Sequence, residues 1–295
     1  MTHAEHDTTQ HTLRREVAGT IGLLADPDDF AAMRRYDTFT FRDHDGYLRE
    51  VERLLRTLAA EGRHTTLALF DPEEYAQFCT ETGLDPDTPD GRSRFTAELA
   101  ATSPTVTYDG RPLGDLVPDL LDESLRHSTI EYAERLLADT GRCADCGEDI
   151  GLAAFTRAAL LLSRILDTAT PGMQHIVCSV TLDTTPLLGS LHAERTADGL
   201  LHLDETEALE VTTVLAVGIA KQSPGGLVQR TTAPGRPDRV CGWRLHGEHL
   251  KPLTEAQVFD AYCTDAHTGD PVPPEPGLDY AQAPDLGPYN DPHTH

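Results

Sequence analysis

The stretch Cys143-Ala-Asp-Cys-Gly-Glu-Asp-Ile150 divides the chain into two sets of helices and strands. Two thiols three positions apart, followed directly by a glycine, are typical of the turn that grips a metal ion in zinc knuckles. Gly147 favours this turn because the backbone amides can point toward the sulfurs only where no side chain stands in the way. The stretch therefore predicts a structural Zn²⁺ bound by Cys143 and Cys146 at the joint between two subdomains.

Structural zinc needs four ligands, so a second pair is required. His175-Ile-Val-Cys178 is the one other stretch with comparable spacing, and it predicts a site of three cysteines and one histidine: Cys143, Cys146, His175 and Cys178. Side chains three positions apart in a regular strand point to opposite faces, so this pair needs a turn or bulge near His175. The alternative for Cys178 is a small buried core residue.

Other chemistry is open to these cysteines and to the histidines. A redox dithiol would gain from the helix expected to begin near Glu148, yet thioredoxin-type motifs follow a strand and here a helix precedes the cysteines. A deaminase combines His-x-Glu with a later Pro-Cys-x-x-Cys, whereas His192-Ala-Glu194 follows the cysteines and no proline precedes them. His3-Ala-Glu5 has the required order but lies in an expected tail, and His246 and His249 form one more possible metal pair.

No sequence pattern of a catalytic nucleophile occurs. The chain lacks the Gly-x-Ser-x-Gly elbow of hydrolases and the glycine-rich loop with lysine that binds phosphates. The paired acids Asp28-Asp29 and Glu73-Glu74 stand at expected helix starts, where the helix dipole accounts for them. We therefore predict no catalytic residue and no residue that binds an organic cofactor.

Length and composition indicate an ordinary folded protein. The 295 residues can form two domains, and the fractions of hydrophobic (39%) and charged (25%) residues lie near globular values. No run of about 18 apolar residues occurs, and the N-terminus lacks the basic start and apolar stretch of a signal peptide. These features predict a cytoplasmic protein without a membrane segment.

The formal net charge of −25 argues against direct binding to nucleic-acid phosphates, which requires clustered basic residues. It suits a partner with a basic surface. A compositional bias is another explanation, because only Lys221 and Lys251 among the 24 basic residues are lysines. The six cysteines are predicted to be reduced, because the chain is long and not dense in cysteine.

Local patterns predict an α+β fold in which helices pack on small mixed sheets, as two subdomains joined near the Cys-x-x-Cys knuckle. The predicted parts are a disordered tail over residues 1–11, a helix-strand domain over 12–140, an α+β domain with the knuckle over 141–267, and an extended Pro/Gly-rich tail over 268–295. The expected elements include helices over 13–24, 113–139, 152–166 and 186–194, strands over 38–41, 65–70 and 175–182, and a hairpin of 227–232 with 239–245.

The runs Arg15–Pro27, Cys143–Gly151 and Ala261–Val272 carry a resemblance. They are similar to uncharacterised actinobacterial cytoplasmic proteins, and the resemblance would cover most of the chain. It implies a bacterial, cytosolic setting. It implies no activity and therefore assigns no catalytic residue.

These observations together predict a non-enzymatic acidic cytosolic protein with a structural zinc, which binds another macromolecule. The alternative is a zinc-dependent hydrolase or deaminase-like enzyme, in which the knuckle is part of an open site. A third possibility is an inhibitor or immunity-type protein that presents its acidic surface to a basic partner.

Overall fold

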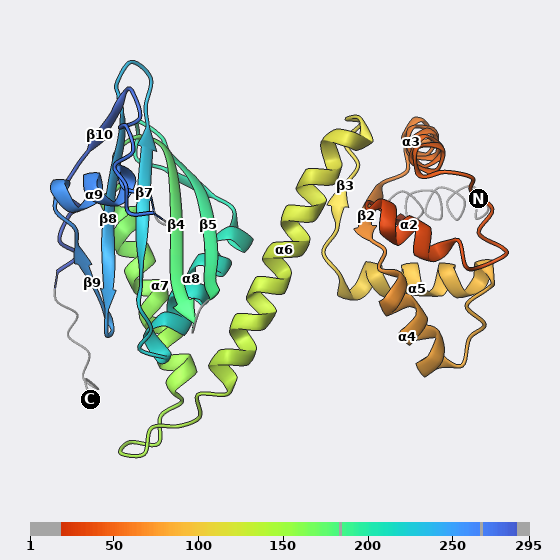
Figure 1. Ribbon diagram of the computed structural model, residues 1–295, viewed down its shortest axis with the longest axis horizontal. Coiled ribbons are helices and arrows are strands. Elements are labelled where there is room, and N and C mark those ends of the chain that lie inside the picture. Colours follow the sequence, from red (N-terminus) through yellow and green to blue (C-terminus); the bar gives the residue numbers. More distant parts are fainter. Residues whose placement is uncertain (1–18, 183–184, 266–267, 288–295) are drawn as a thin grey trace, which may run out of the picture. The chain divides into compact units, whose positions relative to one another are not determined.

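The computed structural model describes residues 19–182, 185–265 and 268–287. The chain forms two compact units that divide between Leu125 and Arg126, inside helix α6 (Leu113–Ala138). The sequence places the boundary after this helix, near residue 140. Each unit combines helices with a sheet, which confirms the predicted α+β class (Figure 1).

Unit 1 contains a three-stranded sheet with the strand order β1-β2-β3. Strands β1 and β2 run parallel, and β3 runs antiparallel to β2. The elements are β1 (Gly19–Leu23), α2 (Pro27–Met33), α3 (His44–Ala60), β2 (Thr65–Leu69), α4 (Pro72–Thr82), α5 (Pro89–Thr102), β3 (Val106–Thr107) and the first part of α6.

Both parallel strands of unit 1 lead into a helix that starts with Asp-Pro. The Asp26 and Asp71 carboxylates accept hydrogen bonds from backbone amides in the first turns of α2 and α4. Pro27 and Pro72 follow at the first helical position, where no amide hydrogen is needed. The sequence predicts both helix starts for this reason.

Strand β1 contradicts the predicted helix over residues 13–24, of which residues 13–18 lie outside the described part. It pairs with β2 from Gly19 to Leu23. The spacing of Ile21 and Leu24 fits a helix, but Gly19 and Gly22 weaken one. Hydrogen bonds to β2 satisfy the backbone amides and carbonyls of β1 instead. The pairing with a distant strand therefore outweighs the helical spacing of the apolar residues.

The segment predicted as a strand at residues 38–41 is an irregular loop. Phe39 and Phe41 pack against Tyr47 of α3, with ring centroids 6.1 and 5.1 Å apart. The Asp87 carboxylate accepts two backbone hydrogen bonds from the start of this loop. Aromatic packing and a carboxylate thus replace a strand partner.

Unit 2 contains a seven-stranded sheet with the order β10-β8-β7-β4-β5-β6, and β9 also pairs with β8. Its neighbouring strands are antiparallel except β10, which runs parallel to β8. The elements are the second part of α6, α7 (Ile150–Thr168), β4 (Gly172–Leu182), β5 (Thr185–Arg195), β6 (Leu201–Leu203), α8 (Glu205–Ala220), β7 (Gly225–Thr232), β8 (Asp238–His246), β9 (His249–Pro252), α9 (Glu255–Tyr262) and β10 (Leu278–Tyr280).

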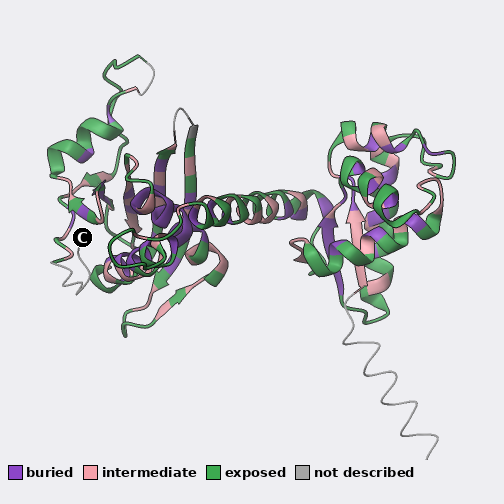
Figure 2. Cartoon of the chain, turned by 90° about the horizontal axis from the view of Figure 1, so that it is seen from below, coloured by how far each residue is buried: buried purple, intermediate pink, exposed green. Residues whose placement is uncertain are grey.

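Helix α8 lies at the centre of unit 2. It packs on β4 and β5, and α7 packs on it in turn. Every residue from Glu210 to Ile219 is buried. Figure 2 shows buried positions concentrated where these helices meet the sheet. Trp243 of β8 belongs to this core, and its indole nitrogen donates to the Pro284 carbonyl at 2.9 Å.

The predicted helix over residues 186–194 is wrong, because these residues form strand β5. The strand pairs with β4 along its whole length. Leu191 and Ala193 are buried while Leu188 and His192 are exposed. This alternation with a period of two is typical of a strand with one buried face.

The predicted tail over residues 268–295 contributes a strand to the same sheet. Strand β10 pairs with β8, and Ala283 beyond it is buried in the core of unit 2. The rest of that tail after residue 287 lies outside the described residues.

Candidate metal centre

The knuckle is a tight backbone loop between α6 and α7. The Cys143 amide donates to the Glu148 carbonyl at 2.8 Å, and the Gly147 amide donates to the Cys143 carbonyl at 2.9 Å. Gly147 has a φ of 76°, a left-handed conformation that glycine adopts without strain. Asp149 then caps α7, because its carboxylate accepts from the Leu152 amide at 2.9 Å. The structure thus forms the tight turn expected of Cys-x-x-Cys-Gly.

Hydrogen bonds converge on the sulfur of Cys143. The backbone amide of Cys146, then that of Asp145, and then the Cys146 thiol lower the pKa of Cys143 below its ordinary value. Such bonds stabilise the thiolate, which is the form that binds zinc. Cys143 is half-buried and Cys146 is exposed, so the pair is accessible to solvent.

The other two predicted ligands, His175 and Cys178, lie in β4 on opposite faces of the sheet. The strand pairs residue by residue with β5 and β7 past both positions, so the bulge that a shared site requires is not formed. Cys178 is fully buried in the core, and burial raises the pKa of its thiol. It therefore takes the alternative role of a small core residue.

The structure does not gather the four predicted ligands into one cluster. Over residues 19–182, 185–265 and 268–287, no three His, Cys, Asp or Glu side chains are grouped so that they could hold a metal ion. The knuckle therefore supplies two ligands, Cys143 and Cys146, and zinc binding there stays a prediction.

The other histidines considered from the sequence have different surroundings. His192 of β5 stacks on His175, with ring centroids 4.5 Å apart and planes 9° apart. His246 and His249 are paired across the β8–β9 turn, and Nδ1 of His249 lies 2.8 Å from the Arg157 guanidinium. His3, His6 and His11 lie outside the described residues.

A pocket lies beside the knuckle, between the start of α7, the end of α8 and the β8–β9 turn. Cys143, Glu148 and Arg157 are among its lining residues. The Arg157 side chain is buried, and its Nε donates to the Glu248 carbonyl at 2.9 Å. One side of the knuckle therefore borders a hollow of unit 2 that is lined by both polar and apolar residues.

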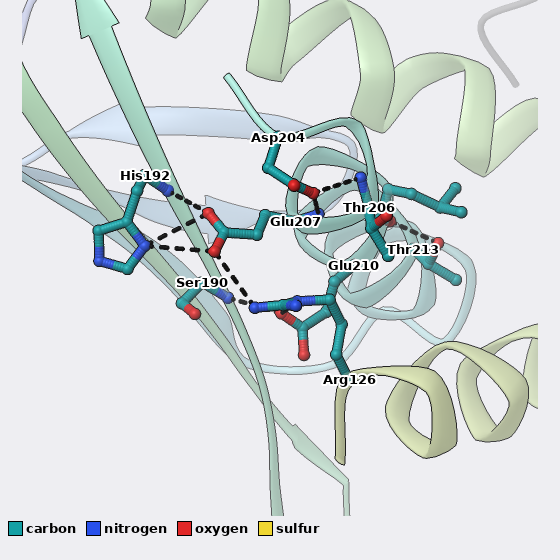
Figure 3. A network of polar contacts seen from close by, with 9 residues as sticks. Arg126, Ser190, His192, Asp204, Thr206, Glu207, Glu210 and Thr213 are labelled. Atoms are coloured by element: carbon teal, nitrogen blue, oxygen red, sulfur yellow. Dashed lines mark hydrogen bonds and ion pairs between the residues drawn. The ribbon is translucent and has the colours of Figure 1, made fainter. Parts of the chain in front are cut away.

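A polar network on α8 is missing from the sequence-based prediction. The Glu207 carboxylate accepts from the His192 amide at 2.6 Å, and the Glu210 carboxylate accepts from the Ser190 amide at 3.1 Å. Arg126 pairs with Glu207 at 3.2 Å (Figure 3). These amides lie on the edge of β5 beyond the stretch that pairs with β6, so the carboxylates cap an open strand edge. The signal in the sequence is Glu210, a glutamate that directly precedes the mostly apolar run Val211–Ala220 of the helix.

Carboxylates also gather in unit 1, after the ends of β1 and β2. Burial and then the neighbouring charges of Asp71, Asp26, Asp28 and Glu73 raise the pKa of Asp29. Asp26 and Asp71 are occupied as helix caps. The sequence assigns the paired acids Asp28-Asp29 and Glu73-Glu74 to helix starts, and they lie in the first turns of α2 and α4.

Residues 8–111 match a family model described as Domain of unknown function (DUF8829). The match supports the resemblance to uncharacterised proteins, and it ends before α6 and the knuckle. No curated protein matches the chain, and no solved structure matches it either. In the described part of the chain, no helix has both the length and the apolar character needed to cross a membrane.

Proposed function

We propose that this chain is a non-enzymatic zinc-binding protein, in which Cys143 and Cys146 hold a structural Zn²⁺ and the metal links the chain to another macromolecule. The observation that carries the proposal is the hydrogen-bonded knuckle. Its amides point at the Cys143 sulfur, and Gly147 takes the left-handed conformation that allows this turn. Zinc binds thiolates on such turns in tetrahedral coordination.

The knuckle offers only two zinc ligands, and this number supports a role in binding another molecule. Two thiolates occupy half of a tetrahedral shell. No third ligand joins them among the described residues, and Cys146 is exposed. Ligands from another molecule can therefore reach the two remaining positions.

The same count disfavours the enzymatic alternative. A catalytic zinc in a hydrolase or deaminase is usually held by three protein ligands, with water in the fourth position. The knuckle supplies two. The proposal includes a cytosolic setting, because thiols stay reduced there, and a partner with a basic surface would suit the net charge of −25.

Zinc content of the purified full chain tests the proposal. After metal removal under reducing conditions and reloading with Zn²⁺, we expect the protein to retain between about half and one zinc per chain. Cys143→Ser and Cys146→Ser should each retain less than about a tenth of an equivalent, because one thiolate cannot hold the ion. The same low content in the unmodified protein would refute zinc binding.

Two variants serve as controls for this measurement. His175→Asn and Cys178→Ala change the other two predicted ligands, which lie on β4 outside the knuckle. Both should retain zinc at the level of the unmodified protein. Circular dichroism confirms that each variant is folded.

A further inference from the structure

We infer that the molecule that completes the site is a second copy of this chain, so that one Zn²⁺ is bound by Cys143 and Cys146 of both copies. This inference rests on the proposed function, since it requires that the knuckle binds zinc. It adds a site of four thiolates that neither copy possesses alone.

Symmetry makes a second copy the simplest source of the missing ligands. The two sulfurs of one knuckle, Cys143 and Cys146, occupy two corners of a tetrahedron. A two-fold rotation about an axis through the metal places an identical pair at the other two corners. Four thiolates form a closed structural zinc site, so no further ligand and no water is required.

The loop is accessible enough for such a contact. Residues 141–149 are exposed except for the half-buried Cys143. Figure 1 shows the loop between α6 and α7 extending beyond the ends of these two helices. The backbone of another knuckle can therefore approach without displacing an element of unit 2.

The charges of the loop make the contact dependent on the metal. Each loop carries Asp145, Glu148 and Asp149, so two metal-free loops repel each other. The bonds between Zn²⁺ and the four thiolates offset this repulsion, and the thiols release their protons when the metal binds. Arg142 brings one positive charge to each knuckle, because its guanidinium donates to the Gly147 carbonyl at 3.1 Å. The copies should therefore separate without zinc and join when it is added.

Light scattering after size-exclusion chromatography tests the shared site. The full chain is reduced, stripped of metal with a chelator and titrated with Zn²⁺ alone. We expect the mass to rise from 32.2 kDa to twice that value, with an end point of one zinc per two chains. Cys143→Ser and Cys146→Ser should stay at the mass of one chain. Cys263→Ser, which changes a buried thiol after α9, should dimerise like the unmodified protein.

Each outcome separates the shared site from the proposed function. A monomer that binds one zinc per chain would overturn the shared site and leave zinc binding by the knuckle intact. Absence of zinc binding would overturn both. A dimer that persists without zinc, or in Cys143→Ser, would show that the copies associate through another surface.

Discussion

Gly189 illustrates, at the scale of a single residue, how closely α8 lies on β5. A Cβ atom at this position would stand 3.2 Å from both the Cα and the nitrogen of Val211. Gly189→Ala should therefore lower the free energy of unfolding by about 1–3 kcal/mol, because the helix must shift. Gly114→Ala is the matched control, since a Cβ there contacts nothing within 4 Å.

In that control the sign reverses. Gly114 lies in the first turn of α6. Alanine there should raise the free energy of unfolding by about 0.4–1 kcal/mol, because it lowers the conformational entropy of the unfolded chain. Chemical denaturation followed by circular dichroism measures both variants. Equal effects of the two substitutions would contradict the close approach of α8 to β5.

We expect His175 to make the stability of unit 2 sensitive to mild acid. Burial and the nearby charges of His192 and Arg230 lower its pKa from 6.5, against the opposite effect of Glu207. With the folded pKa below the unfolded one, the unfolded chain binds more protons as the pH falls below about 6.5, so stability is lost there.

His175→Asn should therefore lose less stability than the unmodified protein between pH 7.5 and pH 5. Thermal unfolding of both proteins at a series of pH values measures the difference, with pH 8 as the reference at which the histidine is neutral. Parallel curves over the whole range would show that His175 does not contribute.

At the scale of elements, the sequence predicts those structures whose signals are local. The hairpin of β7 and β8, the apolar helix α7 and both Asp-Pro helix starts follow from alternation, apolar period and capping chemistry. The turn at Gly147 belongs to this group, because the turn requires a left-handed backbone conformation that glycine adopts without strain.

Strands β1 and β5 could not be predicted in this way, since their partners are distant or their period is ambiguous. β1 depends on β2, which is separated from it by two helices, and β5 carries Pro186 and Gly189 in a short apolar run. The failure to predict the positions of the second ligand pair, His175 and Cys178, also arises because the period of this segment is ambiguous from sequence alone. A strand period of two separates His175 from Cys178, and the sequence alone does not exclude a bulge.

The carboxylates at the edge of β5 should stabilise this strand and protect it from aggregation. Glu207→Ala combined with Glu210→Ala removes the carboxylates that accept from the Ser190 and His192 amides. We expect a loss of about 1–3 kcal/mol in stability and a greater tendency to aggregate, because unpaired edge amides attract other strands. Glu205→Ala, on the exposed first turn of the same helix, is the control and should change little.

Denaturation and light scattering measure the two consequences separately. If the double variant were as stable and as soluble as Glu205→Ala, the carboxylates would not protect the edge of β5.

At the scale of the whole molecule, salt should favour the zinc-linked dimer. The net charge of −25 and the acidic loop residues make two copies repel, and added salt screens this repulsion. At a fixed low Zn²⁺ concentration, the dimer fraction should rise between about 0.05 and about 0.5 M sodium chloride, because the Debye length falls over this range from about 14 Å to about 4 Å. Dissociation of the dimer by salt would instead indicate attraction between opposite charges.

Zinc K-edge X-ray absorption of the zinc-loaded full chain tests the shared knuckle most directly, because it counts the atoms bound to the metal. With Cys143 and Cys146 of two copies as ligands, we expect four sulfurs at about 2.3 Å. A shell of two sulfurs with two lighter atoms, nitrogen or oxygen, would contradict the shared site, and a shell without sulfur would contradict zinc binding by the knuckle.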